Sequence, residues 1–261
     1  MKLSIIIPVK DQSEALLNNL KQKVLPFFDS KKGLTYDVIV VPNGSSEQQR
    51  KLLEEGFKAL PANCHLLDFD PIGAKGRAVR RGLLASSCDY DLVFDADLAT
   101  DLRAFDAILP RLGEYDAFLG NRDDRRSITN KRPLLRKLGH FVSKSMVKVR
   151  FGMKGVGDTQ CGFKCFRDPV AKAMAKRQMI DGIAYDVEHC YFLCLNKFRL
   201  ISIPVIWLND EKGTSIPFAK SSKEFSKDLG RIKKNRKSYI LTKQEKESIY
   251  ADRSVSYTHL T

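Results

Sequence analysis

The sequence predicts an α/β fold in which a largely parallel β-sheet is flanked by helices. Four short apolar or β-branched segments, at residues 3–8, 37–41, 65–69 and 92–95, have the composition of buried strands. Successive segments start roughly thirty residues apart, which is the length of a βαβ unit. Right-handed βαβ crossovers place their strands parallel, and a chain of 261 residues is long enough for one such domain.

Apolar residues at helical spacing follow each of these strands, over residues 13–24, 47–60, 76–87 and 102–112. In the second half of the chain, the same criteria predict strands at 161–166 and 200–207 and a helix at 184–198. Residues 134–149 place lysine and arginine between apolar positions at helical spacing. This pattern predicts a basic amphipathic helix. Its charged face is equally well explained as solvated surface or as a face that binds a membrane surface or the acceptor.

The expected domain organisation is one domain over residues 1–217 followed by a basic, helical C-terminal segment over 218–252. Within that segment Phe225, Leu229 and Ile232 recur at helical spacing. Residues 255–261 can be encoded by a sequence that resembles a transposon-end sequencing adapter, so we expect them to be an artefact and exclude them from the fold. The natural chain is then expected to continue, which leaves room for a C-terminal membrane anchor.

The net charge of +14 predicts anionic partners, namely a nucleotide, a phospholipid surface or nucleic acid. The charge lies in the second half, with ten Lys or Arg against two acids over 122–150 and nine against two over 220–243. No ordered set of aromatic residues interleaves these cations as single-strand binding requires, so we expect no nucleic-acid partner. An anionic membrane surface is the expected partner of the basic segments.

The expected location is the cytoplasm, with peripheral attachment to the cytoplasmic face of the membrane. No apolar run approaches the roughly 18 residues of a membrane-spanning helix, and no signal-peptide pattern opens the chain. Six cysteines without such a signal are typical of reduced thiols.

Two carboxylates, Asp95 and Asp97, follow the apolar run at 92–94. Hard divalent cations bind several oxygen ligands and share them with substrate phosphates, so an Asp-x-Asp pair at a strand end is suited to hold a cation against a diphosphate. Ligands of parallel sheets collect at the carboxyl ends of the strands. Residues 8–12, 43–46, 73–75 and 95–97 all follow predicted strands, and we therefore expect these segments to converge on one crevice.

Motifs in these segments resemble those of the family-2 glycosyltransferases, which have the GT-A fold. They are Ile-Ile-Ile-Pro-Val at 5–9, Val-Pro-Asn-Gly-Ser-Ser at 41–46, Ala-Lys-Gly-Arg-Ala-Val-Arg-Arg-Gly at 74–82 and Asp-Ala-Asp at 95–97. Three later motifs most closely resemble the branch of dolichyl-phosphate and polyprenyl-phosphate β-glucosyltransferases: Gly-Asn-Arg at 120–122, Asp-Thr-Gln-Cys-Gly-Phe-Lys at 158–164 and Tyr-Asp-Val-Glu at 185–188. The dolichyl-phosphate mannosyltransferases are similar but match less well.

The resemblance implies a Rossmann-like sheet and a role for each matching residue. It implies Mg²⁺ or Mn²⁺ bound by Asp95 and Asp97, and catalytic roles for Asp97, Arg122 and Asp158. The residues implied to bind the nucleotide-sugar donor are Pro8, Val9, Gln12, Asn43, Lys75, Asp95 and Gln160. The chain departs from the family at residues 10–12, where an aromatic-Asn-Glu triplet is usual, and at Pro42 and Asn43, where two aspartates are usual. An asparagine can still hydrogen-bond a uracil edge.

The implied reaction is metal-dependent, inverting transfer of a hexose, with glucose favoured, from a nucleotide sugar to a polyprenyl or dolichyl phosphate. A UDP-sugar is favoured over a GDP-sugar. One alternative is transfer to a soluble or polymeric hydroxyl, which requires a general base such as Asp158, Asp186 or Glu188. Another is a non-catalytic protein that binds polyanions or membrane surfaces through its basic half.

Overall fold

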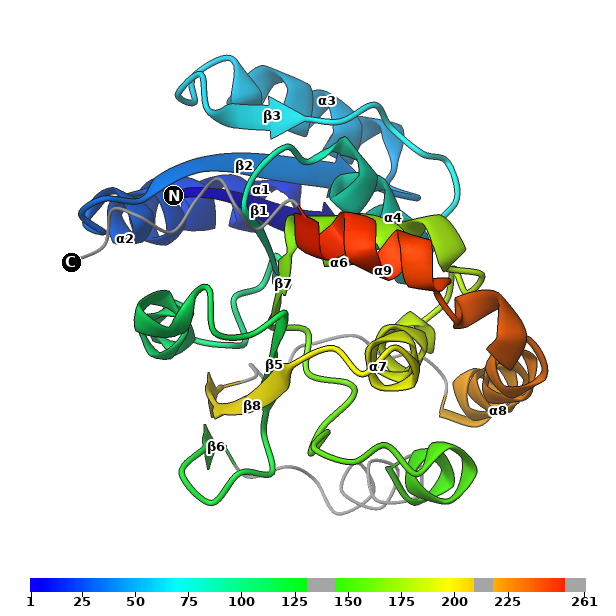
Figure 1. Cartoon of the computed structure of the whole chain (residues 1–261). Helices are drawn as coiled ribbons and strands as arrows, with labels where there is room; N and C mark the ends of the chain where they lie inside the picture. The colour runs from blue at the N-terminus through cyan, green and yellow to red at the C-terminus, as the bar shows by residue number, and fades with distance from the viewer. Residues whose placement is uncertain (131–143, 209–217, 252–261) are drawn as a thin grey trace.

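A computed structural model describes residues 1–130, 144–208 and 218–251, except for the side chains of 218–222. In this part of the chain a seven-stranded sheet has the order β3-β2-β1-β4-β7-β5-β8 (Figure 1). Its strands are β1 (Lys2–Val9), β2 (Thr35–Pro42), β3 (Cys64–Leu66), β4 (Tyr90–Val93), β5 (Ala117–Asn121), β7 (Lys164–Arg167) and β8 (Leu200–Pro204). A separate two-stranded sheet pairs β6 (Ile128–Thr129) with β9 (Ile206–Trp207).

The sheet is mostly parallel, which confirms the predicted α/β class. Strand β1 pairs in parallel with both β2 and β4, and β5 pairs in parallel with β8. Strand β7 lies between β4 and β5 and is antiparallel to both. Its first residue, Lys164, therefore lies at the edge where β4 and β5 end.

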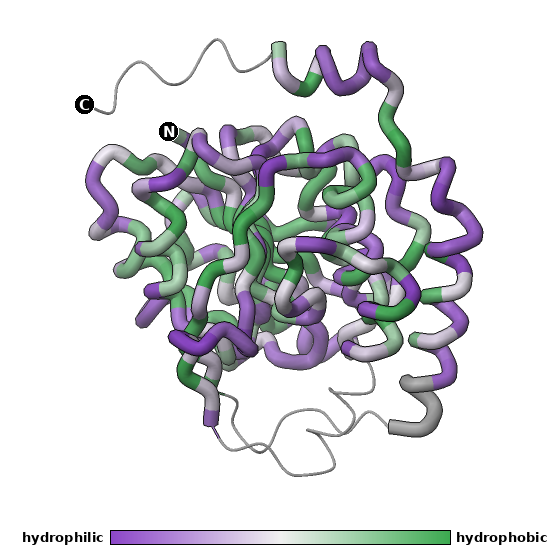
Figure 2. Tube along the Cα trace, turned by 60° about the horizontal axis from the view of Figure 1, so that its bottom comes forward, coloured by the Kyte–Doolittle hydropathy of each residue, from purple (hydrophilic) through white to green (hydrophobic). Residues whose placement is uncertain are grey.

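Helices cover both faces of the sheet. The side chains of β1 point alternately to the two faces and accordingly belong to two different hydrophobic clusters. Leu3, Ile5, Ile7 and Val9 belong to a cluster with residues of α1 (Ser13–Asn19), α2 (Leu25–Asp29) and α3 (Glu47–Phe57). Ile6 belongs to the other, with residues of α4 (Lys75–Ala85), α6 (Asp168–Arg177) and α7 (Tyr185–Leu195). Figure 2 shows hydrophobic positions concentrated in the centre of the molecule and hydrophilic ones on the outer helices.

Two predicted helices have irregular geometry in the structure. The helix predicted over 13–24 continues from α1 into a π-helix, η1 (Leu20–Val24), before α2. Pro26 has no N–H to donate to the carbonyl of Gln22, which accounts for the shift from α-helical bonding. The α-helix predicted over 102–112 is wrong in type, because the structure has two 3₁₀ segments, η2 (Leu102–Ala107) and η3 (Leu109–Arg111), with Pro110 in the second.

Several elements were not expected from the sequence. Strands β5 and β6 and helix α6 lie in stretches for which no element was predicted. The single strand predicted over 200–207 is interrupted at Val205, whose N–H donates to Ser127 Oγ at 2.9 Å instead of continuing the ladder. The antiparallel direction of β7 was also unexpected, since it depends on how the chain returns to the sheet and not on local composition.

The C-terminal segment forms α8 (Phe218–Lys234), the 3₁₀ segment η4 (Arg236–Tyr239) and α9 (Lys243–Ala251). Phe225, Leu229 and Ile232 are buried and belong to the same hydrophobic cluster as α4, α6 and α7.

Residues 144–151 are helical, whereas 134–143 of the predicted basic helix and the suspected artefact at 255–261 lie outside the described residues. No helix in the described parts of the chain is long and apolar enough to cross a membrane.

Candidate active site

The predicted metal ligands follow β4 at the carboxyl edge of the sheet. Strand β4 ends beside β1, with Val93 opposite Ile6, and the chain then turns tightly through Asp95 and Asp97. In this turn Leu98 N–H donates to Asp95 O at 3.0 Å, and Ala99 N–H donates to Asp97 Oδ1 at 3.0 Å. Leu98 has a φ of 52°, a strained value for leucine that makes the turn tight. The turn leaves the Asp97 side chain exposed to solvent.

Asp95 lies between α4 and the loop before β7. Lys75, the first residue of α4, places its Nζ 2.5 Å from Asp95 Oδ1. On the other side, a Cβ at Gly162 would lie 2.4 Å from Asp95 Oδ2, so only glycine permits this approach. The structure therefore brings together three segments of the sequence motifs, 74–82, 95–97 and 158–164.

Arg122 and Asp158 form a buried, two-point ion pair beside this edge. Arg122 Nε lies 2.6 Å from Asp158 Oδ2, and its second terminal nitrogen lies 3.0 Å from Oδ1. Asp158 Oδ1 also accepts from the backbone N–H of Gln160 at 3.0 Å, and the guanidinium stacks over Trp207 with 5.5 Å between Cζ and the ring centroid. The Asp158 side chain is 1% exposed. This pair fixes the loop that carries Asp158 and Gln160 against the end of β5.

Lys164 and Asp186 form a second buried ion pair that sequence reasoning missed. Lys164 Nζ donates to Asp186 Oδ1 and to the carbonyl oxygen of Cys161, and the lysine side chain is only 2% exposed. One signal was present in the sequence, namely a lysine within the apolar run from Phe163 to Phe166. A fully buried lysine requires an anionic partner, but sequence separation gave no indication of which carboxylate it would be.

The cations around Asp95 set the charge state of the Asp-x-Asp pair. Burial alone would raise the pKa of Asp95, but Lys75, and then Lys164 and Arg122, hold that pKa below its usual range. Although the Asp97 side chain is accessible to solvent, the surrounding protein partly desolvates it, and this desolvation and then the adjacent charge of Asp95 raise its pKa. Two carboxylates that repel each other at an accessible edge offer hard oxygen ligands, which fits the Mg²⁺ or Mn²⁺ implied by the sequence.

The residues predicted to bind the nucleotide lie at the ends of β1 and β2. Pro8 and Val9 are buried and pair with Val41 and Pro42. The Asn43 side chain is buried, and its nitrogen donates to Val9 O at 3.1 Å. Gln12 is exposed where α1 begins.

Two contacts hold the loops at this end of the sheet together. Asp11 Oδ1 accepts from the backbone N–H of Ser46 at 2.9 Å. Gly44, with a φ of 57°, packs so closely on Gly73 that an added Cβ would lie 2.3 Å from the Gly73 Cα. The loops after β1, β2 and β3 are thereby fixed relative to one another, as a preformed nucleotide site requires.

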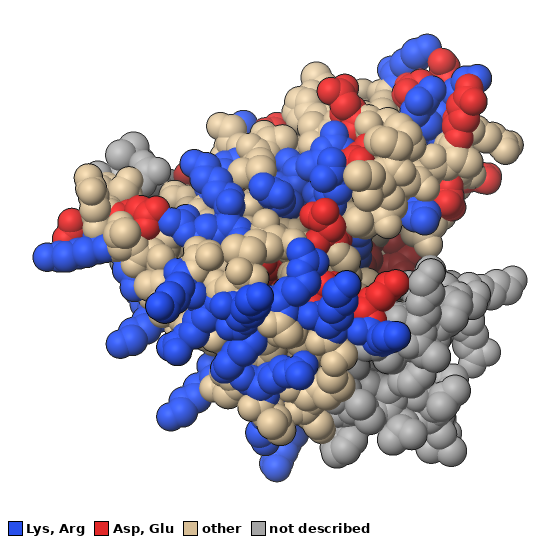
Figure 3. Space-filling view, turned by 90° about the vertical axis from the view of Figure 1, so that its right-hand side faces the viewer, with Lys and Arg blue, Asp and Glu red and all other residues tan. Residues whose placement is uncertain are grey.

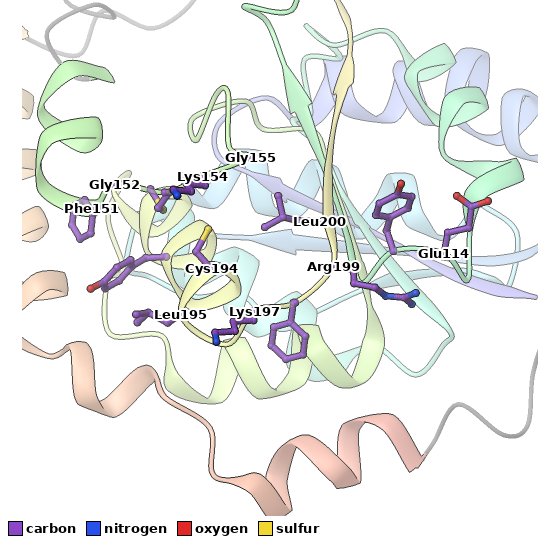
Figure 4. Close-up of a pocket in the computed structure, with 14 residues that line it drawn as sticks. Glu114, Phe151, Gly152, Lys154, Gly155, Cys194, Leu195, Lys197, Arg199 and Leu200 are labelled. Atoms are coloured by element: carbon purple, nitrogen blue, oxygen red, sulfur yellow. The ribbon is translucent and has the colours of Figure 1, made fainter.

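A cavity of about 900 Å³ lies at the opposite edge of the sheet, where β5 and β8 begin (Figure 4). Its lining is mainly apolar, with cationic side chains from Lys154, Lys197 and Arg199. None of the site residues predicted from the sequence lines it. The candidate active site is therefore the edge that carries Asp95 and Asp97.

Comparison with known proteins identifies the family of the chain. The family model "Glycosyl transferase family 2" matches residues 4–174. A dolichyl-phosphate beta-glucosyltransferase of Dictyostelium discoideum is 30% identical over 243 residues, covering 88% of this chain and 73% of that protein. The proteins of the same name from Saccharomyces cerevisiae and Homo sapiens are 24% and 26% identical, covering 87% and 83% of this chain and 72% and 70% of their own lengths.

Solved structures show the same fold at low sequence identity. Glucosyl-3-phosphoglycerate synthase from Mycobacterium tuberculosis, in complex with Mn²⁺, UDP and glucosyl-3-phosphoglycerate, has a TM-score of 0.60 at 11% identity and covers 93% of this chain and 81% of its own. Mannosyl-3-phosphoglycerate synthase from Rubrobacter xylanophilus has a TM-score of 0.56 at 10% identity, covering 90% and 74% of the two chains. The match over residues 4–174 and the 30% identity over most of the chain show that the protein belongs to glycosyl transferase family 2 and is a glycosyltransferase.

Proposed function

We propose that this enzyme transfers glucose from UDP-glucose to a polyprenyl phosphate, with inversion at the anomeric carbon and with Mg²⁺ or Mn²⁺ at Asp95 and Asp97. Relatives named dolichyl-phosphate beta-glucosyltransferase support the sugar and the acceptor. One structural observation carries the proposal. Asp158, Asp186 and Glu188, the three carboxylates that could act as a general base, are each already bound by other groups. A phosphate acceptor requires no base, whereas a hydroxyl acceptor does.

Each of these carboxylates is already held by other groups. Asp158 accepts from Arg122 through both oxygens, and although burial alone would raise the pKa of Asp158, Arg122 holds it below its usual range. Asp186 is paired with the buried Lys164. Glu188 accepts from the N–H groups of 179 and 180 at 2.7 and 3.0 Å, and from the Tyr239 hydroxyl at 2.6 Å, so it has a structural role. None of the three is suited to deprotonate a sugar hydroxyl.

A lipid phosphate is already anionic at neutral pH and can attack the anomeric carbon directly. In this single displacement, the bond from C1 to the lipid phosphate oxygen forms as the bond from C1 to the UDP oxygen breaks, which inverts the configuration. Lys75 and Arg122 provide positive charge for the departing diphosphate and the incoming phosphate. When bound, the metal ion would stabilise the charge that develops on the leaving group. Asn43 would accept a hydrogen bond from the uracil N–H.

The proposed function predicts a sharp difference between two acceptors that share one hydrocarbon chain. With UDP-[¹⁴C]glucose and Mn²⁺, undecaprenyl phosphate should be glucosylated at least about 100-fold faster than undecaprenol, which lacks the anionic nucleophile. The measurement is radiolabel extracted into organic solvent, with GDP-mannose and UDP-N-acetylglucosamine as competing donors. Transfer to undecaprenol or to 3-phosphoglycerate at a comparable rate would instead support the hydroxyl-acceptor alternative.

A lipid acceptor requires that the enzyme approach a membrane, and one face is suited to this. The helix at 144–151 and α8 lie side by side, since Lys233 Nζ donates to Arg150 O at 2.8 Å. Among the described side chains, these two helices and η4 carry ten exposed cations, here named the basic surface: Lys144, Lys148, Arg150, Lys223, Lys227, Arg231, Lys233, Lys234, Arg236 and Lys237. Figure 3 shows the cations of this side of the molecule gathered in a broad band. Acidic residues exposed to solvent are few there.

The basic surface continues toward the proposed acceptor side of the active site. A cavity of about 210 Å³ between the helix at 144–151 and the loop before β7 is lined by Lys144, Val147, Lys148, Met153, Val156, Gly157 and Thr159. Gly157 and Thr159 flank Asp158. Val149 is 87% exposed between Lys148 and Arg150, so the basic surface also presents an apolar side chain. These features support docking of the enzyme on an anionic bilayer through the basic surface.

Removal of charge from this surface should weaken vesicle binding. Along α8, Lys223, Lys227 and Lys234 lie on one exposed stripe, and each cation near an anionic bilayer contributes about 1 kcal/mol. The triple change of these lysines to glutamine should therefore reduce partitioning onto phosphatidylglycerol vesicles by about 100-fold. Co-sedimentation at 0.1 M salt provides the measurement.

The matched control removes three lysines elsewhere, at Lys21, Lys32 and Lys51, and should bind vesicles nearly as the unmodified protein does. Equal losses in the two triple variants would show a non-specific charge effect. Binding to neutral phosphatidylcholine vesicles that is as strong as binding to phosphatidylglycerol would contradict the proposal.

A further inference from the structure

The contact between Lys75 and Asp95 differs from the other ion pairs of the active site in its accessibility. The side chains of Lys75 and Asp95 are 34% and 37% exposed, and their charged atoms lie 2.5 Å apart. Lys164, by contrast, is buried and donates to both Asp186 and a backbone carbonyl. The Lys75 ammonium can therefore leave Asp95 for another anion without breaking a buried hydrogen-bond network.

The charges at this edge leave Lys75 as the cation that neutralises the proposed metal ligands. Arg122 contacts Asp158 and Lys164 contacts Asp186, so of these three cations only Lys75 forms an ion pair with Asp95. The two proposed ligands, Asp95 and Asp97, and the ammonium of Lys75 together carry a charge of −1. Without the lysine charge they sum to −2, the charge that best complements a divalent cation.

A metal ion and the Lys75 ammonium cannot both lie close to Asp95 Oδ1 without strong repulsion. Mg²⁺ and Mn²⁺ bind carboxylate oxygens at about 2.1 Å, so a metal on this oxygen would lie at most about 4.6 Å from an ammonium 2.5 Å from the same atom. At a partly buried site such repulsion is weakly screened. A diphosphate would supply the ammonium with another anion.

We propose that Lys75 is a positioning residue that acts as an internal counter-cation for Asp95: it opposes metal binding until a nucleoside diphosphate arrives to accept its ammonium. Metal and nucleotide then bind cooperatively, because each is favoured by the movement of Lys75 from Asp95 to the diphosphate. By thermodynamic linkage, the same factor describes the effect of metal on nucleotide and of nucleotide on metal. This inference rests on the metal and donor sites of the proposed function and goes beyond them by assigning their coupling to one side chain.

The test measures binding and not turnover. Mn²⁺ affinity is measured by electron paramagnetic resonance on the full chain, with and without UDP, for the unmodified protein and for Lys75→Gln. In the absence of UDP, Lys75→Gln should bind Mn²⁺ at least tenfold more tightly than the unmodified protein. In the presence of Mn²⁺ it should bind UDP at least tenfold more weakly, so the cooperativity between the two ligands is lost.

Two further variants distinguish this role from a general effect of charge. Lys75→Arg keeps the cation and should retain weak Mn²⁺ binding without UDP. Arg80→Gln removes a positive charge from the same helix, where Arg80 Nε donates to Ala175 O at 3.1 Å, and should leave the Mn²⁺ affinity unchanged.

Three results would overturn the inference: Mn²⁺ affinity in Lys75→Gln that is unchanged or weaker, an equal gain in Arg80→Gln, or no Mn²⁺ binding by any variant with UDP present. Failure of the proposed function is a separate result. It would appear as normal cooperative binding of Mn²⁺ and UDP without transfer to undecaprenyl phosphate.

Discussion

Replacement of Asp97 by alanine is expected to lower turnover by about 100- to 1,000-fold and to abolish Mn²⁺-dependent binding of UDP. Asp97 is the exposed carboxylate of the Asp-x-Asp turn, and its Oδ1 is oriented by the N–H of Ala99. Loss of this oxygen ligand removes half of the proposed protein contribution to the metal site. Isothermal titration of UDP with and without Mn²⁺, together with the glucosyl-transfer assay, provides the measurement.

The same change should not destabilise the fold, which separates a functional effect from unfolding. Asp97 is repelled by the adjacent Asp95, so its removal relieves unfavourable charge interaction. The melting temperature of Asp97→Ala should equal or slightly exceed that of the unmodified protein. Asp106→Ala is the matched control, because this aspartate forms only an exposed pair with Lys31 and should retain full activity. Turnover of Asp97→Ala within tenfold of the unmodified enzyme would rule out the assigned role.

Replacement of Arg122 by methionine should cause the largest loss of stability among the site variants, about 3–5 kcal/mol in the free energy of unfolding. The change leaves the Asp158 carboxylate buried without its two-point partner. Turnover should fall as well, since Arg122 is the cation proposed to face a substrate phosphate. Urea unfolding followed by circular dichroism measures the first effect, and the transfer assay measures the second.

The loss of stability should depend on pH in a defined direction. Although burial alone would raise the pKa of Asp158, Arg122 holds it below its usual range in the folded protein. The contribution of the pair is therefore fully present above about pH 4 and is lost as the pH falls through the lower, folded-state pKa. In Arg122→Met the buried carboxyl group should take up a proton more readily, so the difference in stability from the unmodified protein should shrink on acidification.

Arg126 provides a close control, because it forms a similar two-point pair with Asp124 in the same loop but its side chain is 71% exposed. Arg126→Met should cost less than about 1 kcal/mol. The double variant Arg122→Met, Asp158→Leu removes both charges and should recover much of the stability without recovering turnover. Recovery of turnover in the double variant would show that Arg122 serves only to neutralise Asp158.

The elements predicted correctly are those with strong local patterns. Strands β1, β2 and β4 are apolar runs bounded by polar residues, and helices α3 and α4 have clear amphipathic spacing, so burial on one face is evident from composition alone. Strand β5 was missed because its five residues, Ala117–Asn121, follow a turn and contain glycine, which weakens the strand signal. The 3₁₀ geometry at 102–107 depends on the packing of Leu102, Ala104 and Phe105 in the hydrophobic cluster that they share with α1, α2 and α3. No local sequence pattern encodes this packing.

By itself the sequence determined which residues follow the strands of a parallel sheet, and hence that Asp95, Asp97 and Asn43 lie at one edge. This follows from local hydrophobic periodicity and from the rule that parallel strands end on the same side. Only the tertiary structure decided how the charged groups pair: Lys75 with Asp95, Arg122 with Asp158 and Lys164 with Asp186. These partners lie 20 to 36 residues apart in the sequence. The pairs of Arg122 with Asp158 and of Lys164 with Asp186 also depend on the antiparallel insertion of β7. The balance between burial and charge that all three pairs reflect arises only when the chain is folded.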